Sequence, residues 1–159
     1  GYEFSILQSV MTVNEMQKTI IIPKIQSFFK NNLTGKKIAL WGLSFKPDTD
    51  DVREAPSLYM IDELTKNGAQ ITAFDPEAMD NVKDLIGDKI KYADNHLECL
   101  KDADALLIAT EWAIFRNPDF DTMKSMLKNP VIFDGRNLYE LDQMRNLGFK
   151  YFSIGRPHN

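Results

Sequence analysis

Apolar residues recur three or four positions apart over residues 6–29, with polar side chains between them, and this spacing predicts a helix. Pro23 interrupts the pattern and is expected to kink that helix or divide it in two. Two interpretations remain open. Either the helix packs on the sheet of its own domain, or it is a connecting or dimerising helix whose other face contacts a different domain.

Beyond a turn-forming cluster at 31–35, short apolar runs alternate with helical patterns up to the end of the chain. The run at 105–109 is apolar throughout, as expected of a strand that is buried on both faces. The alternation predicts an α/β fold, a Rossmann-like parallel sheet with helices on both faces. We expect strands at 37–41, 70–74, 89–92, 105–109, 131–133 and 151–154, and helices at 58–66, 77–85, 96–101, 119–127 and 140–147.

The length of the chain suits one domain, or one domain with an attached helical arm. The chain has 159 residues and a net charge of −4, which argues against a nucleic-acid partner. No segment reaches the roughly 18 uninterrupted apolar residues of a membrane-spanning helix. The one cysteine, Cys99, allows no disulfide within the chain. A protein without disulfides is typical of the reducing cytoplasm, so we expect a cytoplasmic location. The sequence opens without a methionine inside a patterned segment, so we expect it to be a fragment of a longer protein.

Two basic residues follow different predicted strands, Lys46 after the first and Arg136 after the fifth. The carboxyl ends of parallel strands meet at one edge of the sheet, where open α/β folds bind their ligands. A lysine point charge beside an arginine fork suits an anion such as a phosphate. The alternative, equally open, is that both are surface residues paired with Asp48, Asp50 or Asp134.

Asp75 ends the second predicted strand, where dinucleotide-binding folds carry the acidic residue that holds a ribose. However, the turn that begins at Gly42 lacks the G-x-G-x-x-G pattern with which such folds approach a pyrophosphate. Asp75 is therefore interpreted as the N-cap of the next helix, with Pro76 at the first helical position.

Other candidate chemistry is weak. Cys99 lies in a predicted amphipathic helix and is interpreted as a buried structural thiol. His96 and His158 have no ligand-like spacing to cysteines or carboxylates, so no metal site is predicted. Trp112 and Phe115 are interpreted as packing residues of a lid or an edge. The acidic residues after the first strand are interpreted as turn and cap residues: Asp48, Asp50 and Asp51.

The segment 42–57, GLSFKPDTDDVREAPS, joins the first predicted strand to the next helix. It is similar to the signature of the carboxyl-terminal domain of the UDP-glucose/GDP-mannose dehydrogenase family, with its Phe-Lys-Pro, Thr-Asp-Asp and Arg-Glu elements all in order. The resemblance covers essentially the whole chain. Four further pieces agree with it: VNE and QK at 13–15 and 17–18, AFDP at 73–76, TEW at 110–112 and DGR at 134–136.

The resemblance implies an enzyme of three parts: an amino-terminal NAD-binding Rossmann domain, a central helical region that forms a homodimer, and a nucleotide-sugar-binding domain. Residues 1–33 correspond to the end of the central helix, and residues 34–159 correspond to the UDP-sugar-binding domain. The family oxidises the C6 alcohol of a sugar nucleotide to a carboxylate, with NAD as the oxidant. The resemblance favours UDP-glucose as the substrate, with GDP-mannose or a UDP-N-acetyl-hexosamine as alternatives.

By the family pattern, Phe45 and Lys46 contact the sugar nucleotide, Arg136 helps to hold it, and Arg53 reaches toward the NAD pyrophosphate across a cleft. The Gly-Gly-Ser-Cys-Phe-type segment that carries the family's catalytic cysteine does not occur in this sequence, and Cys99 does not match it. We therefore expect no catalytic residue here and no dehydrogenase activity from this chain alone. The alternative to a substrate-binding domain is an assembly module that oligomerises through its first helix.

Overall fold

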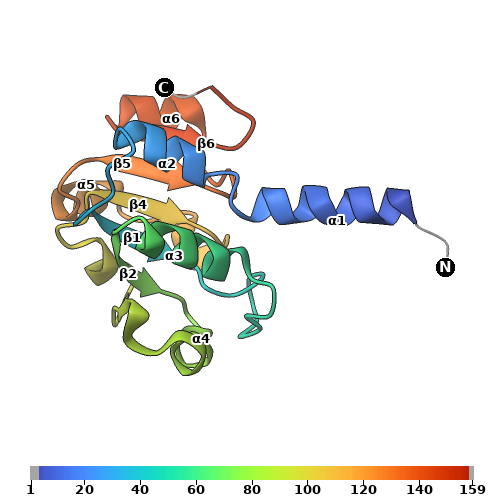
Figure 1. Ribbon diagram of the computed structural model, residues 1–159. Helices are drawn as coiled ribbons and strands as arrows, with labels where there is room; N and C mark the ends of the chain where they lie inside the picture. The colour runs from blue at the N-terminus through green and yellow to red at the C-terminus, as the bar shows by residue number, and fades with distance from the viewer. Residues whose placement is uncertain (1–3, 158–159) are drawn as a thin grey trace.

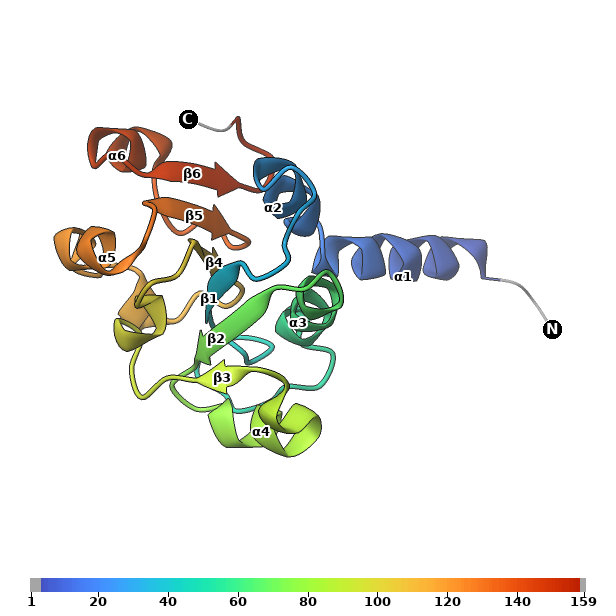
Figure 2. The ribbon, with the colours of Figure 1, turned by 60° about the vertical axis from the view of Figure 1, so that its left-hand side comes forward.

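The computed structural model describes residues 4–157, in which six parallel strands form one sheet. Their spatial order is β3-β2-β1-β4-β5-β6 (Figures 1 and 2). The first strand lies in the middle of the sheet, β2 and β3 extend it toward one edge, and β4, β5 and β6 extend it toward the other. The predicted Rossmann-like sheet is confirmed. The strands are β1 (Lys37–Trp41), β2 (Gln70–Phe74), β3 (Lys91–Tyr92), β4 (Ala105–Ile108), β5 (Val131–Asp134) and β6 (Lys150–Ser153).

Helices cover both faces of the sheet, as predicted, and each face has its own apolar cluster. Helices α2, α3 and α4 lie on one side, and α5 and α6 lie on the other (Figure 2). Along β1, Ile38 and Leu40 join the first cluster, whereas Ala39 and Trp41 join the second. The α-helices are α1 (Ser5–Lys18), α2 (Ile22–Phe28), α3 (Pro56–Lys66), α4 (Met79–Ile86), α5 (Phe120–Met126) and α6 (Leu141–Asn146), and the 3-10 turns are η1 (Gly87–Lys89), η2 (Glu98–Leu100) and η3 (Ala113–Phe115).

Two predicted helices differ from the structure. The helix expected at 77–85 begins only at Met79, because the chain first makes a turn around the Asp75 carboxylate. The helix expected at 96–101 is only the 3-10 turn η2, in which Cys99 and Leu100 are buried. Among the described helices, none combines the length and the apolar character needed to cross a membrane.

The first predicted helix is divided in two, as expected, by a turn at residues 19–21 just before Pro23. Pro23 then lies in the first turn of α2, where its missing N–H has no helical partner to lose. Helix α2 packs on the sheet through Ile22 and Ile25. Helix α1 instead extends away from the domain (Figure 1) and leaves these large apolar residues exposed: Ile6, Leu7, Val10, Met11, Val13 and Met16.

Gly42 allows the ends of β1 and β4 to approach closely. Its φ of +90° lies in the left-handed region, and a Cβ placed there would lie 2.5 Å from the Cβ of Thr110 and 2.6 Å from its backbone nitrogen. Those atoms belong to backbone and a branched side chain, so they cannot move aside easily. Glycine at this position therefore sets how tightly the first loop packs against the residues after β4.

We predict that Gly42→Ala lowers the free energy of unfolding by about 3 kcal/mol, because it adds a steric clash to an unfavourable backbone conformation. Gly35→Ala is the matched control, since Gly35 also has a positive φ, +72°, but an added Cβ would meet no atom within 4 Å. That substitution should lower the free energy by only about 1 kcal/mol. Urea unfolding followed by circular dichroism measures both, and equal losses would contradict the packing argument.

Candidate functional site

The residues singled out for binding lie on loops at the carboxyl ends of the central strands. Phe45 and Lys46 follow β1, Glu111 follows β4 and Arg136 follows β5. Because β4 lies between β1 and β5 in the sheet, the loop that carries Glu111 separates the two basic residues. The strand order reverses between β1 and β4, and this switch point is where open α/β sheets bind their ligands.

The loop after β1 closes on itself through a hydrogen bond of 2.8 Å from the Phe45 amide to the Asp51 carbonyl. This closure leaves Phe45 half exposed, at 50%, and Lys46 also exposed. Within residues 4–157, no ion pair joins Lys46 to Asp48 or Asp50, so the predicted alternative of such a pair is wrong for this lysine. The loop therefore offers an apolar ring and an ammonium group to solvent.

Arg136 makes a forked ion pair with Glu111. Its Nε and Nη2 atoms donate to the two carboxylate oxygens over 2.5 and 2.7 Å. Burial is the largest single influence on the pKa of Glu111 and acts to raise it, but the hydrogen bond and charge of Arg136, a backbone hydrogen bond and the charge of Arg116 together hold that pKa below its ordinary value. The partner predicted for Arg136, Asp134, instead accepts from its backbone N–H over 2.7 Å. Two N–H groups of the guanidinium are thus used, and the others remain available to an anion.

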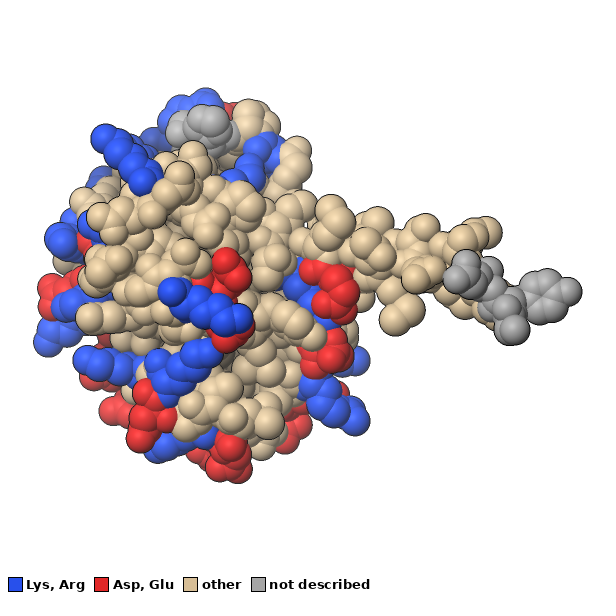
Figure 3. Space-filling model, viewed as in Figure 1, with Lys and Arg blue, Asp and Glu red and all other residues tan. Residues whose placement is uncertain are grey.

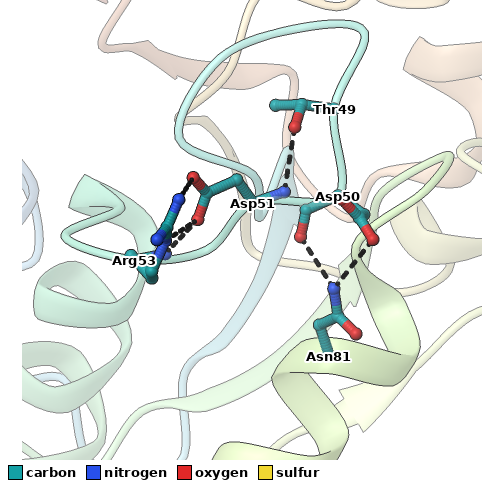
Figure 4. Close-up of polar contacts among 5 residues, drawn as sticks. All are labelled: Thr49, Asp50, Asp51, Arg53 and Asn81. Carbon is teal, nitrogen blue, oxygen red and sulfur yellow. Dashed lines mark hydrogen bonds and ion pairs between the residues drawn. The ribbon is translucent and has the colours of Figure 1, made fainter.

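Arg53 forms a second arginine fork, with Asp51 of the same loop (Figure 4). Its Nε and Nη2 atoms donate to the carboxylate of Asp51 over 2.9 and 2.7 Å, while the Arg53 side chain remains 87% exposed. The hydrogen bonds from Arg53 lower the pKa of Asp51 to about 2. The Asp51 amide in turn donates to the Thr49 hydroxyl, and Asn81 of α4 donates to Asp50, which agrees with the predicted turn role of these acidic residues.

Asp75 does not cap α4, and that prediction is wrong. The N-cap residue of α4 is Ala78, and α4 begins at Met79. One carboxylate oxygen of Asp75 accepts from the amides of Glu77 and Ala78, over 3.0 and 2.9 Å, and so closes a turn ahead of the helix. Pro76 belongs to this turn and not to the helix.

The other oxygen of Asp75 binds the loop after β1. It accepts from the amides of Leu43 and Ser44, over 2.6 and 3.0 Å, and from the Ser44 hydroxyl. The indole N–H of Trp112, which follows β4, lies 3.0 Å from both this oxygen and the Ser44 hydroxyl. Asp75 is only 1% exposed, so a buried carboxylate joins the ends of β1, β2 and β4. The sequence carries no local signal for this role, because its partners lie more than thirty positions away.

The predictions for Cys99, Trp112 and Phe115 agree with the structure. Cys99 is buried, and burial raises the pKa of its thiol to about 12, which excludes a reactive thiolate. Trp112 and Phe115 are buried packing residues. His96 borders an aromatic cluster, and within the described residues no group of side chains is placed to hold a metal ion. His158 lies outside the described residues.

We predict that Asp75→Asn lowers the free energy of unfolding by about 3 kcal/mol, because the amide would turn N–H groups toward buried donors and leave them unpaired. Urea unfolding measures the loss. Asp80→Asn, an exposed aspartate in α4, is the control and should change stability by less than about 0.5 kcal/mol. If Asp75→Asn lowers the free energy of unfolding by no more than the control does, Asp75 does not hold the ends of β1, β2 and β4 together.

We predict that Arg53→Ala returns the pKa of Asp51 from about 2 toward its ordinary value of 3.8. Because the folded pKa is the lower one, the pair stabilises the folded chain above pH 3.8, and this contribution disappears as the pH falls through about 2. Carboxyl NMR titration measures the shift. Arg145→Ala, which breaks the separate pair with Asp142, should leave Asp51 unchanged. An Asp51 that still titrates near pH 2 without Arg53 would assign the shift to backbone donors.

The chain was compared with known proteins by sequence and by structure. Residues 39–141 match the model of the UDP-glucose/GDP-mannose dehydrogenase family, UDP binding domain. UDP-glucose 6-dehydrogenase of Pseudomonas aeruginosa is 40% identical over an alignment that covers 99% of this chain and 36% of that protein. UDP-glucose 6-dehydrogenase TuaD of Bacillus subtilis is 38% identical, with 99% and 34% covered.

Among solved structures, a UDP-glucose dehydrogenase from the archaeon Pyrobaculum islandicum superposes with a TM-score of 0.82 at 27% identity, covering 99% of this chain and 34% of that one. The chain thus spans about a third of the length of the relatives it matches. The matched region contains Phe45, Lys46, Arg53 and Arg136. The chain belongs to the UDP-glucose/GDP-mannose dehydrogenase family and contains its UDP binding domain.

Proposed function

We propose that this chain is the UDP-sugar-binding part of an NAD-dependent UDP-glucose 6-dehydrogenase, which oxidises UDP-glucose to UDP-glucuronate. The observation that carries the proposal is the family match over residues 39–141. This segment contains the candidate residues that follow β1 and β5, near the switch point of the sheet. The match to relatives of that name along nearly the whole chain supports UDP-glucose over other nucleotide sugars. GDP-mannose and UDP-N-acetyl-hexosamines remain the alternative substrates.

In this proposal, Lys46 and Arg136 bind the diphosphate of the sugar nucleotide. Lys46 contributes a flexible point charge: it makes no ion pair within residues 4–157, although its charge helps to lower the pKa of Asp51. Arg136 contributes a planar fork whose direction is already fixed by Glu111. Phe45 offers a half-exposed ring against which the sugar nucleotide packs. A mobile cation and an oriented one together suit a diphosphate, which carries oxygens on two centres.

Arg53 is proposed to face the cofactor. Its guanidinium is exposed and is held out from the loop by Asp51, so the pyrophosphate of a dinucleotide could replace that carboxylate as its partner. The dinucleotide itself, NAD, would be bound mainly by an amino-terminal domain, and it supplies the hydride acceptor for the oxidation. The residues of this chain bind and orient the two substrates, and none of them is assigned a catalytic role.

Helix α1 is proposed to be the end of the family's central helix, at which two copies of the protein form a homodimer. It carries no charged residue before Glu15, and its apolar side chains are exposed (Figure 3). Such a helix is stable in water when a second apolar surface covers it. Within residues 1–33, the exposed face of α1 would then contact the partner copy, while residues 34–159 bind the nucleotide. A cytoplasmic location remains a prediction.

We predict that UDP binds this chain and that Lys46→Ala and Arg136→Ala each weaken binding about tenfold, because each removes a charged contact to phosphate. Isothermal titration calorimetry measures the affinities. Arg145→Ala, which removes an exposed, paired arginine of α6, is the control and should bind UDP as the unmodified chain does. Equal affinity in all four proteins would remove Lys46 and Arg136 from the site. A chain that dimerises but gives no heat with UDP would favour the assembly module.

A further inference from the structure

Lys18 is the buried residue of an otherwise exposed helix. It ends α1, and its side chain is only 7% exposed. Three oxygens surround its ammonium group: that of Glu15 over 2.8 Å, that of the Tyr59 hydroxyl over 3.0 Å, and that of Glu54 in a shorter contact. A lysine has three N–H donors, so each donor has its own acceptor. Lys18 therefore has no donor left for a ligand.

These partners belong to different parts of the chain. Glu15 lies in α1, Tyr59 in α3, and Glu54 in the loop between β1 and α3. The Tyr59 hydroxyl also donates to Glu54 over 2.8 Å, and the Lys18 ammonium lies 4.1 Å from the centre of the Tyr59 ring. Charged side chains gather at this junction, where α1 meets the body of the domain (Figure 3). We call these four residues, Glu15, Lys18, Glu54 and Tyr59, the clasp.

The clasp holds a residue whose backbone is unusual. Glu54 has a φ of +57°, in the left-handed region that residues other than glycine rarely adopt. Such a conformation persists where the surroundings fix it. Here a backbone hydrogen bond of 3.1 Å from the Ala55 amide to the Val52 carbonyl closes the turn around Glu54, and the Glu54 side chain is held by Lys18 and Tyr59. Glu54 directly follows Arg53, so the same contacts set the direction in which the chain leaves Arg53.

We infer that Lys18 is a positioning residue, which fixes the loop of residues 51–55 against the end of α1 and so presents Arg53 in one direction. This inference rests on the proposed contact between Arg53 and the dinucleotide. Lys18 acts through Glu54 and Arg53 and touches neither substrate. Because the clasp joins α1 to this loop, one buried ammonium group sets both the orientation of α1 and the direction of Arg53.

The test uses the full-length dehydrogenase that contains this domain. Lys18→Met should raise the Michaelis constant for NAD about tenfold and change that for UDP-glucose by less than about twofold. Lys18→Arg, which retains a positive charge and several donors, should recover part of the loss. Lys66→Met is the matched control, because it also removes a lysine ion pair, that with Asp62, but on the exposed side of α3. It should leave both constants unchanged.

A double-substitution cycle separates positioning from general damage. If Lys18 acts through Arg53, then Lys18→Met adds no further rise in an Arg53→Ala background. The inference is overturned if Lys18→Met raises the Michaelis constant for NAD as much in the Arg53→Ala background as in the unmodified protein. It is also overturned if Lys18→Met raises the Michaelis constants for NAD and UDP-glucose equally. If Lys18→Met does not fold, as judged by its melting curve, Glu54→Gln takes its place with the same criteria.

The single variant Arg53→Ala keeps the two proposals distinguishable. If it raises the Michaelis constant for NAD while Lys18→Met does not, the cofactor contact stands and the positioning role is refuted. If it leaves that constant unchanged, the proposed contact between Arg53 and NAD fails, and the positioning role fails with it.

Discussion

The buried carboxylate of Asp75 is the constraint on which the candidate site depends. A parallel sheet ends in loops whose backbone N–H groups need acceptors, and burial makes each unpaired group unfavourable. Asp75 supplies those acceptors to the loops after β1 and β2 and to the indole that follows β4. In return, its charge is stabilised by backbone, hydroxyl and indole donors, because hydrogen bonds to an ionised group are strong. The three strand ends are therefore fixed relative to one another.

The regular elements can be predicted because their signals are local. Residues 37–41 and 70–74 form strands with the predicted boundaries, since a fully apolar or alternating run bounded by turn residues determines a strand without reference to its neighbours. Two candidate binding residues, Lys46 and Arg136, can be singled out for a related reason, because the end of each strand marks the edge of the sheet where ligands bind. The roles of Phe45 and Arg53 rest on the family resemblance.

The side-chain pairings cannot be predicted in the same way, because their partners are distant in sequence. Arg136 pairs with Glu111, twenty-five positions away, and Lys18 reaches Glu54 across thirty-six. No periodicity relates such positions, and several nearer aspartates are equally good partners by spacing alone. The prediction for Asp75 is wrong for the same reason. The Asp-Pro pair is a familiar helix-start signal, whereas the donors from Leu43 and Trp112 become visible only when the sheet is assembled.

Both arginines of the proposed site, Arg53 and Arg136, are already paired with carboxylates, whereas Lys46 makes no ion pair within residues 4–157. A paired guanidinium holds its direction, so an incoming phosphate meets an oriented fork, although it must compete with a carboxylate. In the proposed function, such pairing lowers the affinity for phosphate but fixes the direction of each guanidinium. That combination agrees with the proposal that this surface forms only one part of a binding cleft.

The signature segment 42–57 divides into buried residues that build the loop and exposed residues that are proposed to contact ligands. Gly42 permits the close approach to Thr110, the Ser44 hydroxyl is held between Asp75 and Trp112, and the Ser57 hydroxyl donates to the Leu43 carbonyl over 2.5 Å. These residues are buried. By contrast, the residues proposed to contact the ligands, Phe45, Lys46 and Arg53, are exposed. Because the buried residues fix the path of the loop, they also fix where the exposed side chains leave it, so substitution at the buried positions is expected to move the exposed ones.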